Sequence, residues 1–260
     1  MMRIIPRLMV AAFALAASFV APVASAGNLA IAAAADLQFA MNEIVAAFRQ
    51  ARPDDQIDVI YGSSGKFYTQ IQQGAPFDLY FSADIAFPRG LEEKGLSVGP
   101  TRPYAIGRIV LWSNTRDASQ MTLADLTDPA IGKIAIANPR HAPYGKRAEE
   151  ALRSVGLWDA LQGKLVQGEN IAQTAQFVQT GNADVGIIAL SLALNPTLGA
   201  AGGYYLIDAK LHEPLEQGFI IMKRAEKNFL ANAFAEFMGG KEARAIMIRY
   251  GFVLPGEAAR

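Results

Sequence analysis

The chain contains 260 residues, with 24 basic and 24 acidic side chains and no cysteine. This neutral balance excludes a strongly basic surface for nucleic acid or for an anionic membrane, so any bound anion must be held by local groups. The absence of cysteine excludes disulfides, thiolate metal sites and a lipid-modified cysteine. The length suits one large α/β domain or two smaller lobes.

The first 26 residues have the pattern of a secretory signal peptide. Arg3 and Arg7 give a positive start, residues 8–20 form an apolar run that contains a single serine, and Ala24-Ser25-Ala26 is a small-residue cleavage site. The run is shorter than the roughly 20 residues that a membrane-spanning helix needs. Its removal takes away two basic residues, which leaves 22 basic against 24 acidic and a net charge of −2. We therefore expect an exported protein that is soluble in the periplasm.

The mature part opens with a strand, a helix and a second strand. Residues 29–34 and 57–61 are short apolar runs bounded by turn residues, which is typical of buried strands. Between them, apolar residues recur at helical spacing from Leu37 to Phe48, and Pro53 ends the pattern. This segment predicts a β-α-β unit.

Short strands continue to alternate with helices, which predicts an α/β fold with mixed, mainly parallel sheets flanked by helices. Further strands are expected at 79–82, 109–112, 134–137, 185–188, 204–207 and 218–222. Further helices are expected at 67–73, 85–94, 146–155, 171–180, 227–238 and 241–250.

No repeat or charged linker marks a domain boundary. The least patterned pieces are residues 104–107 and 208–217, and we place two crossings between lobes near them. One lobe would then comprise residues 27–106 and 216–260, and the other residues 107–215. A chain that leaves the first lobe and re-enters it predicts a ligand cleft between the lobes, at the carboxyl ends of the strands.

Four short turns each join a strand to a helix start, and at least three of them carry little acid. The first N–H groups of a helix have no intrahelical acceptor, and the helix dipole places about half a positive charge there. Several such starts that converge on one cleft would bind a small anion without a cationic side chain. The turns are Ala35-Asp36-Leu37, Gly62-Ser63-Ser64-Gly65, Pro143-Tyr144-Gly145 and Glu169-Asn170-Ile171.

The serine turn fits neither of the catalytic signatures that it suggests. In Gly62-Ser63-Ser64-Gly65-Lys66, two residues stand where a phosphate loop needs four, and Lys66 stands where a hydrolase elbow needs glycine. Two interpretations remain. The hydroxyls and backbone N–H groups face an oxyanion, with Ser64 the best single donor, or the serines cap a helix.

Other polar residues give weaker signals. The phenol of Tyr144 either reaches the cleft as a donor or lies on the surface. His141 and His212 lack the spacing of zinc ligands. Asp78 and Asp84 bracket a strand end as paired catalytic carboxylates would, although a helix cap by Asp84 is the favoured explanation.

The run from Gly74 to Asp84, GAPFDLYFSAD, closely resembles a segment of the periplasmic molybdate-binding proteins of molybdate ABC importers, the ModA family. The resemblance covers essentially the whole mature part. Other segments that match the family occur in the same order along the chain, at 33–37, 63–64, 138–145 and 249–252.

The resemblance implies a two-lobed periplasmic-binding-protein type II fold that closes by hinge motion over one dehydrated tetrahedral oxyanion. The oxyanion partners would be Asp36 through its backbone N–H, Ser64, Tyr144, and Ile171 through its backbone N–H. The implied function is capture of molybdate, and tungstate, for a membrane permease. The protein would be a monomer with no catalytic residue, no cofactor and no direct metal ligand.

Three positions depart from the best-known members of the family. Those members have a serine at position 36, a small residue at position 144 and a ligand-binding tyrosine at position 189, where this chain has Asp36, Tyr144 and Ala189. Tyr144 would replace the donor missing at Ala189. An ionised Asp36 about 4 Å from a dianion would be repelled by roughly 8 kcal/mol at an effective dielectric constant of 20. We therefore expect its carboxylate to cap the following helix while its N–H faces the ligand.

Two alternatives remain open. The receptor could take another ligand, namely sulfate, chromate, a small organic anion, a species with a protonated oxygen or a cation. The chain could instead be an exported hydrolase with Ser64 as nucleophile, although neither His141 nor His212 has a recognisable relation to the serine turn that would make it the base.

Overall fold

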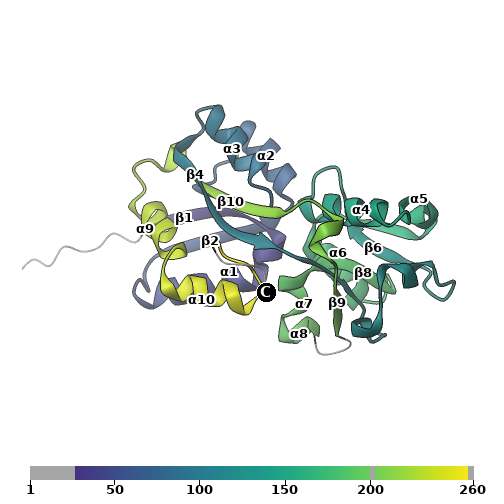
Figure 1. Cartoon of the computed structure of the whole chain (residues 1–260). Helices are drawn as coiled ribbons and strands as arrows, with labels where there is room; N and C mark the ends of the chain where they lie inside the picture. Colours follow the sequence, from purple (N-terminus) through teal and green to yellow (C-terminus); the bar gives the residue numbers. More distant parts are fainter. Residues whose placement is uncertain (1–26, 200–202, 257–260) are drawn as a thin grey trace, which may run out of the picture.

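The computed structural model describes residues 27–199 and 203–256, so the predicted signal peptide lies outside the described residues. Two five-stranded sheets, each with its own helices, form two lobes that lie side by side (Figure 1). Only Arg108 separates β4 (Ser97–Gly107), an edge strand of the first sheet, from β5 (Ile109–Trp112) of the second sheet. The predicted two-lobed α/β fold is confirmed.

The first sheet has the strand order β2-β1-β3-β10-β4. Strands β2, β1 and β3 are parallel, and β10 runs antiparallel to both β3 and β4. Its strands are β1 (Asn28–Ala34), β2 (Gln56–Gly62), β3 (Leu79–Ser82), β4 (Ser97–Gly107) and β10 (Leu215–Met222). Its helices are α1 (Gln38–Gln50), α2 (Ser64–Gln72), α3 (Ala86–Glu93), α9 (Phe229–Met238) and α10 (Lys241–Arg249).

The second sheet repeats this arrangement, with the order β7-β6-β8-β5-β9. Strands β7, β6 and β8 are parallel, and β5 runs antiparallel to both β8 and β9. Its strands are β5 (Ile109–Trp112), β6 (Ile134–Ala137), β7 (Leu165–Gly168), β8 (Val185–Ala189) and β9 (Tyr204–Leu206). Its helices are α4 (Pro143–Ser154), α5 (Trp158–Leu161), α6 (Ile171–Gln179), α7 (Leu190–Ala193) and α8 (Pro196–Gly199).

The cores explain why the strands have continuous apolar runs. Helices cover both faces of each sheet, so successive residues such as Ile31 and Ala32 are both fully buried. The core of the second lobe also includes Ala34, Ala35 and Ala83, which belong to the first lobe. The lobes therefore pack directly against each other at the carboxyl ends of β1 and β3.

Two strands were not predicted, and both lie at sheet edges. Strand β4 contains Pro100 and Pro103, which an edge strand tolerates because one side of it needs no ladder hydrogen bonds. Strand β7 has four residues and pairs only with β6. The lobe limits at residues 106/107 and 215/216 stay a prediction. Among the described residues, no helix is both long and apolar enough to cross a membrane.

Candidate oxyanion site

One small cavity between the lobes draws lining residues from all four of the turns. It has a volume of about 10 Å³, close to the minimum that one water molecule needs. An anion of several atoms therefore enters only if the lobes separate. The lining residues are Ala34, Ala35, Asp36, Gly62, Ser63, Ser64, Ala83, Ala142, Pro143, Tyr144 and Ile171.

Each turn brings a helix start to this cavity. Asp36 lies in the short 3₁₀ helix η1 (Ala35–Leu37), which runs into α1, whereas Ser64, Tyr144 and Ile171 lie in the first turns of α2, α4 and α6. Within the part of the chain that the structure describes, the backbone N–H groups of these four residues do not donate to any of the backbone oxygens in turns, loops and caps. They add the positive ends of helix dipoles to a shared space.

Local sequence explains the start of α4. The helix begins at Pro143 rather than at the predicted Lys146, because proline is well suited to the first helical position. A Cβ atom at Gly145 would lie 2.0 Å from the main-chain oxygen of Ala137. Glycine there lets α4 start close to the end of β6, which brings Tyr144 into the cavity wall.

The hydroxyl of Ser64 is held in place, and its hydrogen has no acceptor in the described residues. Its Oγ accepts the backbone N–H of Ala83 at 3.0 Å, and the buried phenol of Tyr80 donates to the Ser64 carbonyl at 2.8 Å. A hydroxyl has one hydrogen to donate as well as two acceptor positions. No acceptor for that hydrogen occurs in the described residues. The helix-cap interpretation is wrong, because neither serine side chain caps α2.

Asp36, Tyr144 and Gln217 form a buried hydrogen-bond network beside the cavity. The Tyr144 hydroxyl donates to Asp36 Oδ2 at 2.9 Å, and Gln217 Nε2 donates to the same oxygen at 2.8 Å. The predicted capping by the Asp36 carboxylate is wrong, since no side-chain hydrogen bond caps η1 or α1. The carboxylate accepts hydrogen bonds from Tyr144, in the other lobe, and from Gln217, on β10, instead.

Gln217 was missed by the sequence interpretation. It is fully buried in β10, next to the predicted strand 218–222. The available signal in the sequence was a glutamine next to an apolar strand, because a glutamine that is buried with such a strand needs a polar partner. Gly107 makes room for the network, since a Cβ there would lie 2.3 Å from the Tyr144 hydroxyl oxygen and 2.6 Å from Gln217 Nε2.

Burial dominates the ionisation of the network. It raises the pKa of the Asp36 carboxyl to about 6, against the opposing effects of Gln217, Tyr144 and the nearby backbone N–H groups of Asp36 and Leu37. Burial, and then the Asp36 charge, raise the pKa of Tyr144 well above its usual value. The ion pairs of the described residues do not include Asp36. Asp36 Oδ1 and Gln217 Oε1 are buried and have no hydrogen-bond partner.

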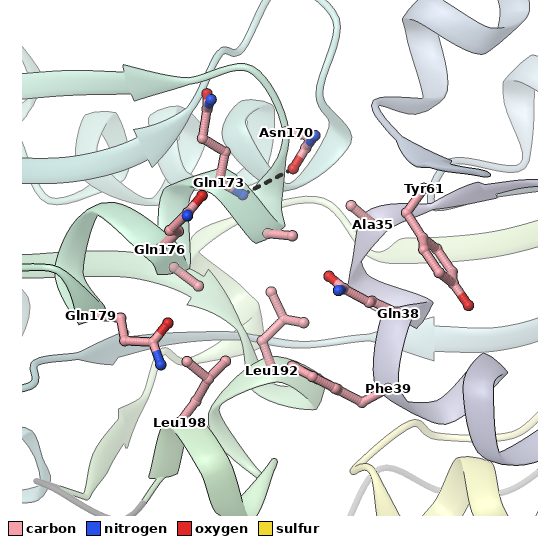
Figure 2. Close-up of a pocket in the computed structure, with 12 residues that line it drawn as sticks. Ala35, Gln38, Phe39, Tyr61, Asn170, Gln173, Gln176, Gln179, Leu192 and Leu198 are labelled. Atoms are coloured by element: carbon pink, nitrogen blue, oxygen red, sulfur yellow. Dashed lines mark hydrogen bonds between the residues drawn. The ribbon is translucent and has the colours of Figure 1, made fainter. Parts of the chain in front are cut away.

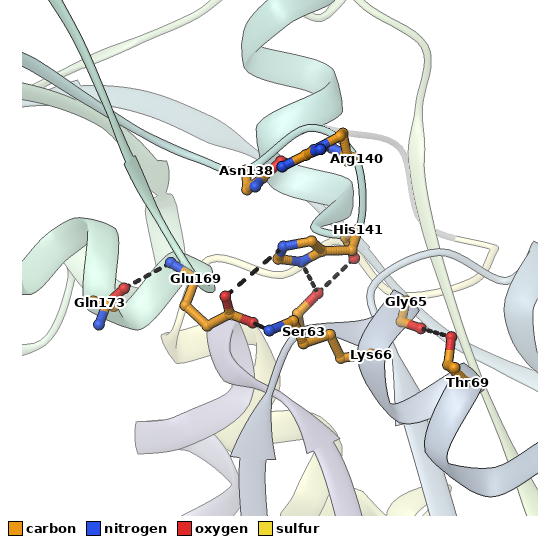
Figure 3. Close-up of polar contacts among 9 residues, drawn as sticks. All are labelled: Ser63, Gly65, Lys66, Thr69, Asn138, Arg140, His141, Glu169 and Gln173. Carbon is orange, nitrogen blue, oxygen red and sulfur yellow. Dashed lines mark hydrogen bonds and ion pairs between the residues drawn. The ribbon is translucent and has the colours of Figure 1, made fainter. Parts of the chain in front are cut away.

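Polar contacts bridge the two lobes beside the cavity (Figure 3). The main-chain oxygen of His141 accepts the Gly65 N–H at 2.9 Å and also the Ser63 hydroxyl. Lys66 forms an ion pair with Glu169. His141, for which no relation to the serine turn was recognised, therefore contacts it. These five residues form the interlobe contact.

The interlobe contact is not a hydrolytic triad. The Ser63 hydroxyl donates to the His141 carbonyl, so the ring Nδ1, which lies 2.9 Å from Ser63 Oγ, has no serine hydrogen to accept. The other ring nitrogen lies 3.9 Å from Glu169, beyond hydrogen-bond distance. Burial, opposed by Glu169, lowers the pKa of His141. Ser64 is the nucleophile of the hydrolase alternative. No hydrogen bond between its side chain and His141 occurs in the described residues.

Asp78 and Asp84, the pair that brackets a strand end, both accept backbone N–H groups. Asp78 Oδ2 accepts the Ala30 N–H at 2.9 Å, and Asp84 Oδ1 accepts the Ala86 N–H at 2.9 Å at the start of α3. No group of three histidine, aspartate or glutamate side chains that could hold a metal ion occurs in the described residues.

A larger hollow of about 500 Å³ opens beside the small cavity and shares Ala35 with it (Figure 2). Gln38 and Phe39 of α1 form one wall, and α6 forms the facing wall. The polar side chains that line it are neutral: Gln38, Tyr61, Asn170, Gln173, Gln176 and Gln179. No charged side chain therefore lines this hollow among the described residues.

Comparisons with known proteins agree with this architecture. Residues 29–253 match the family described as bacterial extracellular solute-binding protein. The chain is 36% identical to the molybdate-binding protein ModA of Azotobacter vinelandii, over 93% of this chain and 96% of that protein. It is 35% identical to ModA of Rhodobacter capsulatus, over 88% of this chain and 90% of that protein.

Solved structures give the same result. The periplasmic molybdate-binding protein of Azotobacter vinelandii superposes with a TM-score of 0.82 at 31% identity, over 87% of this chain and 99% of that chain. The sulfate-binding protein SubI of Mycobacterium tuberculosis, at 16% identity and a TM-score of 0.68 over 88% of each chain, shares the fold alone. The chain therefore belongs to the bacterial extracellular solute-binding proteins and, within them, to the ModA family of molybdate-binding proteins.

Proposed function

We propose that this protein is a periplasmic receptor that captures molybdate, and also tungstate, and delivers it to the membrane permease of an ABC importer. The observation that carries the proposal is the convergence of four helix-start turns, at Asp36, Ser64, Tyr144 and Ile171, on one buried cavity. The relatives named for molybdate binding support the choice of ligand.

The proposed binding site uses neutral donors only. The N–H groups of Asp36, Ser64, Tyr144 and Ile171 and the Ser64 hydroxyl each donate to an oxygen of the tetrahedral anion. Such donors act strongly on a doubly charged acceptor because water is excluded around them. A fixed ring of donors also discriminates by size, since the slightly smaller sulfate would leave some of them beyond hydrogen-bond distance.

Ligand binding and lobe closure are linked in this proposal. The donors come from both lobes, so only the closed form completes the set, and the ligand favours that form. The permease then recognises the closed form. We further propose that the receptor is monomeric, that it has no cofactor, and that it catalyses no reaction.

The test is a melting-temperature screen of the protein from residue 27 onward against molybdate, tungstate, sulfate, phosphate and chromate. Molybdate and tungstate should each raise the melting temperature, because a ligand that binds only the folded state stabilises it by mass action. A rise with sulfate, phosphate or chromate but not with molybdate would contradict the proposal. Turnover of a chromogenic ester, abolished by Ser64→Ala, would contradict its non-enzymatic part.

A further inference from the structure

Asp36 places an ionisable carboxyl group in the wall of a cavity that is proposed to bind a dianion. The residue is 1% exposed and lines the cavity together with Ser64 and Tyr144. A carboxylate and a dianion repel each other, and a dry site screens that repulsion poorly. The site must therefore remove one of the charges or offset it.

The two carboxyl oxygens of Asp36 have different surroundings. Oδ2 accepts hydrogen bonds from Tyr144 and Gln217 at 2.9 and 2.8 Å, and these two donors are also in contact with each other at 3.0 Å. Oδ1 is buried without a hydrogen-bond partner. One oxygen is thus anchored, and the other, on a residue that lines the cavity, has no partner.

No neighbouring charge offsets Asp36. Facing it are Tyr144 from α4, Gln217 from β10 and Tyr104 from β4, and burial raises the pKa of both tyrosines well above the usual value, so they remain neutral. From α7, the Ser191 hydroxyl donates to the main-chain oxygen of Asp36 at 2.8 Å and does not reach its carboxylate.

Charged side chains of the interlobe contact lie next to Ser63, which lines the same cavity. Lys66 is already paired with Glu169, and both are about half exposed. Burial lowers the pKa of His141, which keeps this ring uncharged at neutral pH. None of these groups forms an ion pair with Asp36 in the described part of the chain.

We propose, on the basis of the proposed function, that Asp36 binds the oxyanion as a neutral carboxylic acid, taking up one proton from solvent when the anion enters. The proton forms an O–H bond at Oδ1, which then donates a hydrogen bond to an oxygen of the anion. Oδ2 keeps both of its donors. The acid becomes one more neutral donor in the ring, and its uptake of a proton removes the repulsion.

This proton uptake makes affinity depend on pH. Because the Asp36 pKa is about 6 before the anion enters, the proton is available at little cost near neutral pH. Above pH 6 the apparent affinity should fall about tenfold per pH unit, as each binding event must first restore the proton. At pH 8 the protein should take up about one proton as the anion binds.

The experiment is titration calorimetry of the protein from residue 27 onward with sodium molybdate between pH 6.5 and 8.5, a range in which molybdate is a dianion. Two buffers with different ionisation enthalpies give the number of protons taken up. The native protein should take up about 0.8 proton at pH 6.5 and nearly one at pH 8. Its affinity should fall about tenfold from pH 7 to pH 8.

Asp36→Asn should abolish both effects. The amide keeps an oxygen for Tyr144 and Gln217 and presents an N–H where Oδ1 stood, so it should bind molybdate with no proton uptake and no pH slope. At pH 8 it should bind at least as tightly as the native protein. The matched control is Asp78→Asn, which alters a buried carboxyl of the same lobe outside the cavity and should keep the native proton uptake.

The outcomes separate the two proposals. Molybdate binding by the native protein without proton uptake overturns the role of Asp36 and leaves the receptor function standing, and so does a pH slope that Asp36→Asn retains. Absence of molybdate binding to the native protein at every pH overturns the receptor function itself.

Discussion

Substitution of Gly65 by alanine should weaken ligand binding without weakening the fold. Gly65 lies in the first turn of α2, in the first lobe, and a Cβ there would be 2.7 Å from the main-chain oxygen of His141 in the second lobe. The contact is with backbone, so neither group can rotate away. The lobes would have to part by several tenths of an ångström.

That separation should cost the hydrogen bonds of the interlobe contact. The Gly65 N–H and the Ser63 hydroxyl both donate to the His141 carbonyl. At about 0.5 to 1.5 kcal/mol for each bond, the closed form loses about 1 to 3 kcal/mol relative to the open form. The ligand favours the closed form, so the dissociation constant should rise about 5- to 150-fold.

The unliganded Gly65→Ala protein should be as stable as the native protein or more stable. Gly65 does not have a positive φ, so alanine fits its backbone conformation. Alanine also favours a helix by up to about 1 kcal/mol over glycine. Gly163→Ala is the matched control, because a Cβ there meets nothing within 4 Å.

The assay is titration calorimetry with molybdate, paired with urea unfolding of the unliganded protein. Lower affinity at unchanged or raised unfolding free energy is the expected result for Gly65→Ala, with native behaviour for Gly163→Ala. Native affinity in Gly65→Ala would show that binding does not need the observed lobe contact, and the reasoning would fail.

Three further changes test other parts of the site. Ser64→Ala removes a donor to a charged acceptor and leaves the Ala83 N–H unpaired, so calorimetry should show a loss of about 1 to 3 kcal/mol in binding, and unchanged affinity would exclude the hydroxyl from the site. Asp36→Asn should raise the unfolding free energy at pH 8 by about 3 kcal/mol and have little effect near pH 4. The folded pKa of about 6 lies above the ordinary carboxyl value of 3.8, so the native Asp36 contributes stability that is present below pH 3.8 and lost as pH rises through 6. Urea unfolding that shows equal effects of the substitution at both pH values would refute this. Glu169→Gln should change affinity less than fivefold, because its pair with Lys66 is about half exposed, and a tenfold loss at either low or high salt would contradict that.

Local chemistry made much of the site predictable. A helix start is encoded by a few adjacent residues, so the four turns could be recognised without knowing how they meet. The bounds of β3, β5 and β6 were predicted correctly for a similar reason, since each is a short apolar run between turn residues. The four predicted oxyanion partners all line the cavity, and their contact with a ligand stays a prediction.

Nonlocal contacts were not predictable. Gln217 lies 181 positions from Asp36, and no spacing rule connects them. The capping prediction for Asp36 failed because tertiary partners, Tyr144 and Gln217, outcompeted the local backbone for its carboxylate. Strand β4 was missed for a different reason, because its two prolines contradict strand propensity everywhere except at a sheet edge, and edge position is a property of the fold.

The most direct test of the account is a crystal structure with molybdate, in which anomalous scattering locates the molybdenum. The account predicts one peak in the cavity between the lobes, with anion oxygens about 2.7 to 3.2 Å from the backbone nitrogens of Asp36, Ser64, Tyr144 and Ile171. A peak in the glutamine-lined hollow or on the outer surface, with those four nitrogens bound to other groups, would contradict it.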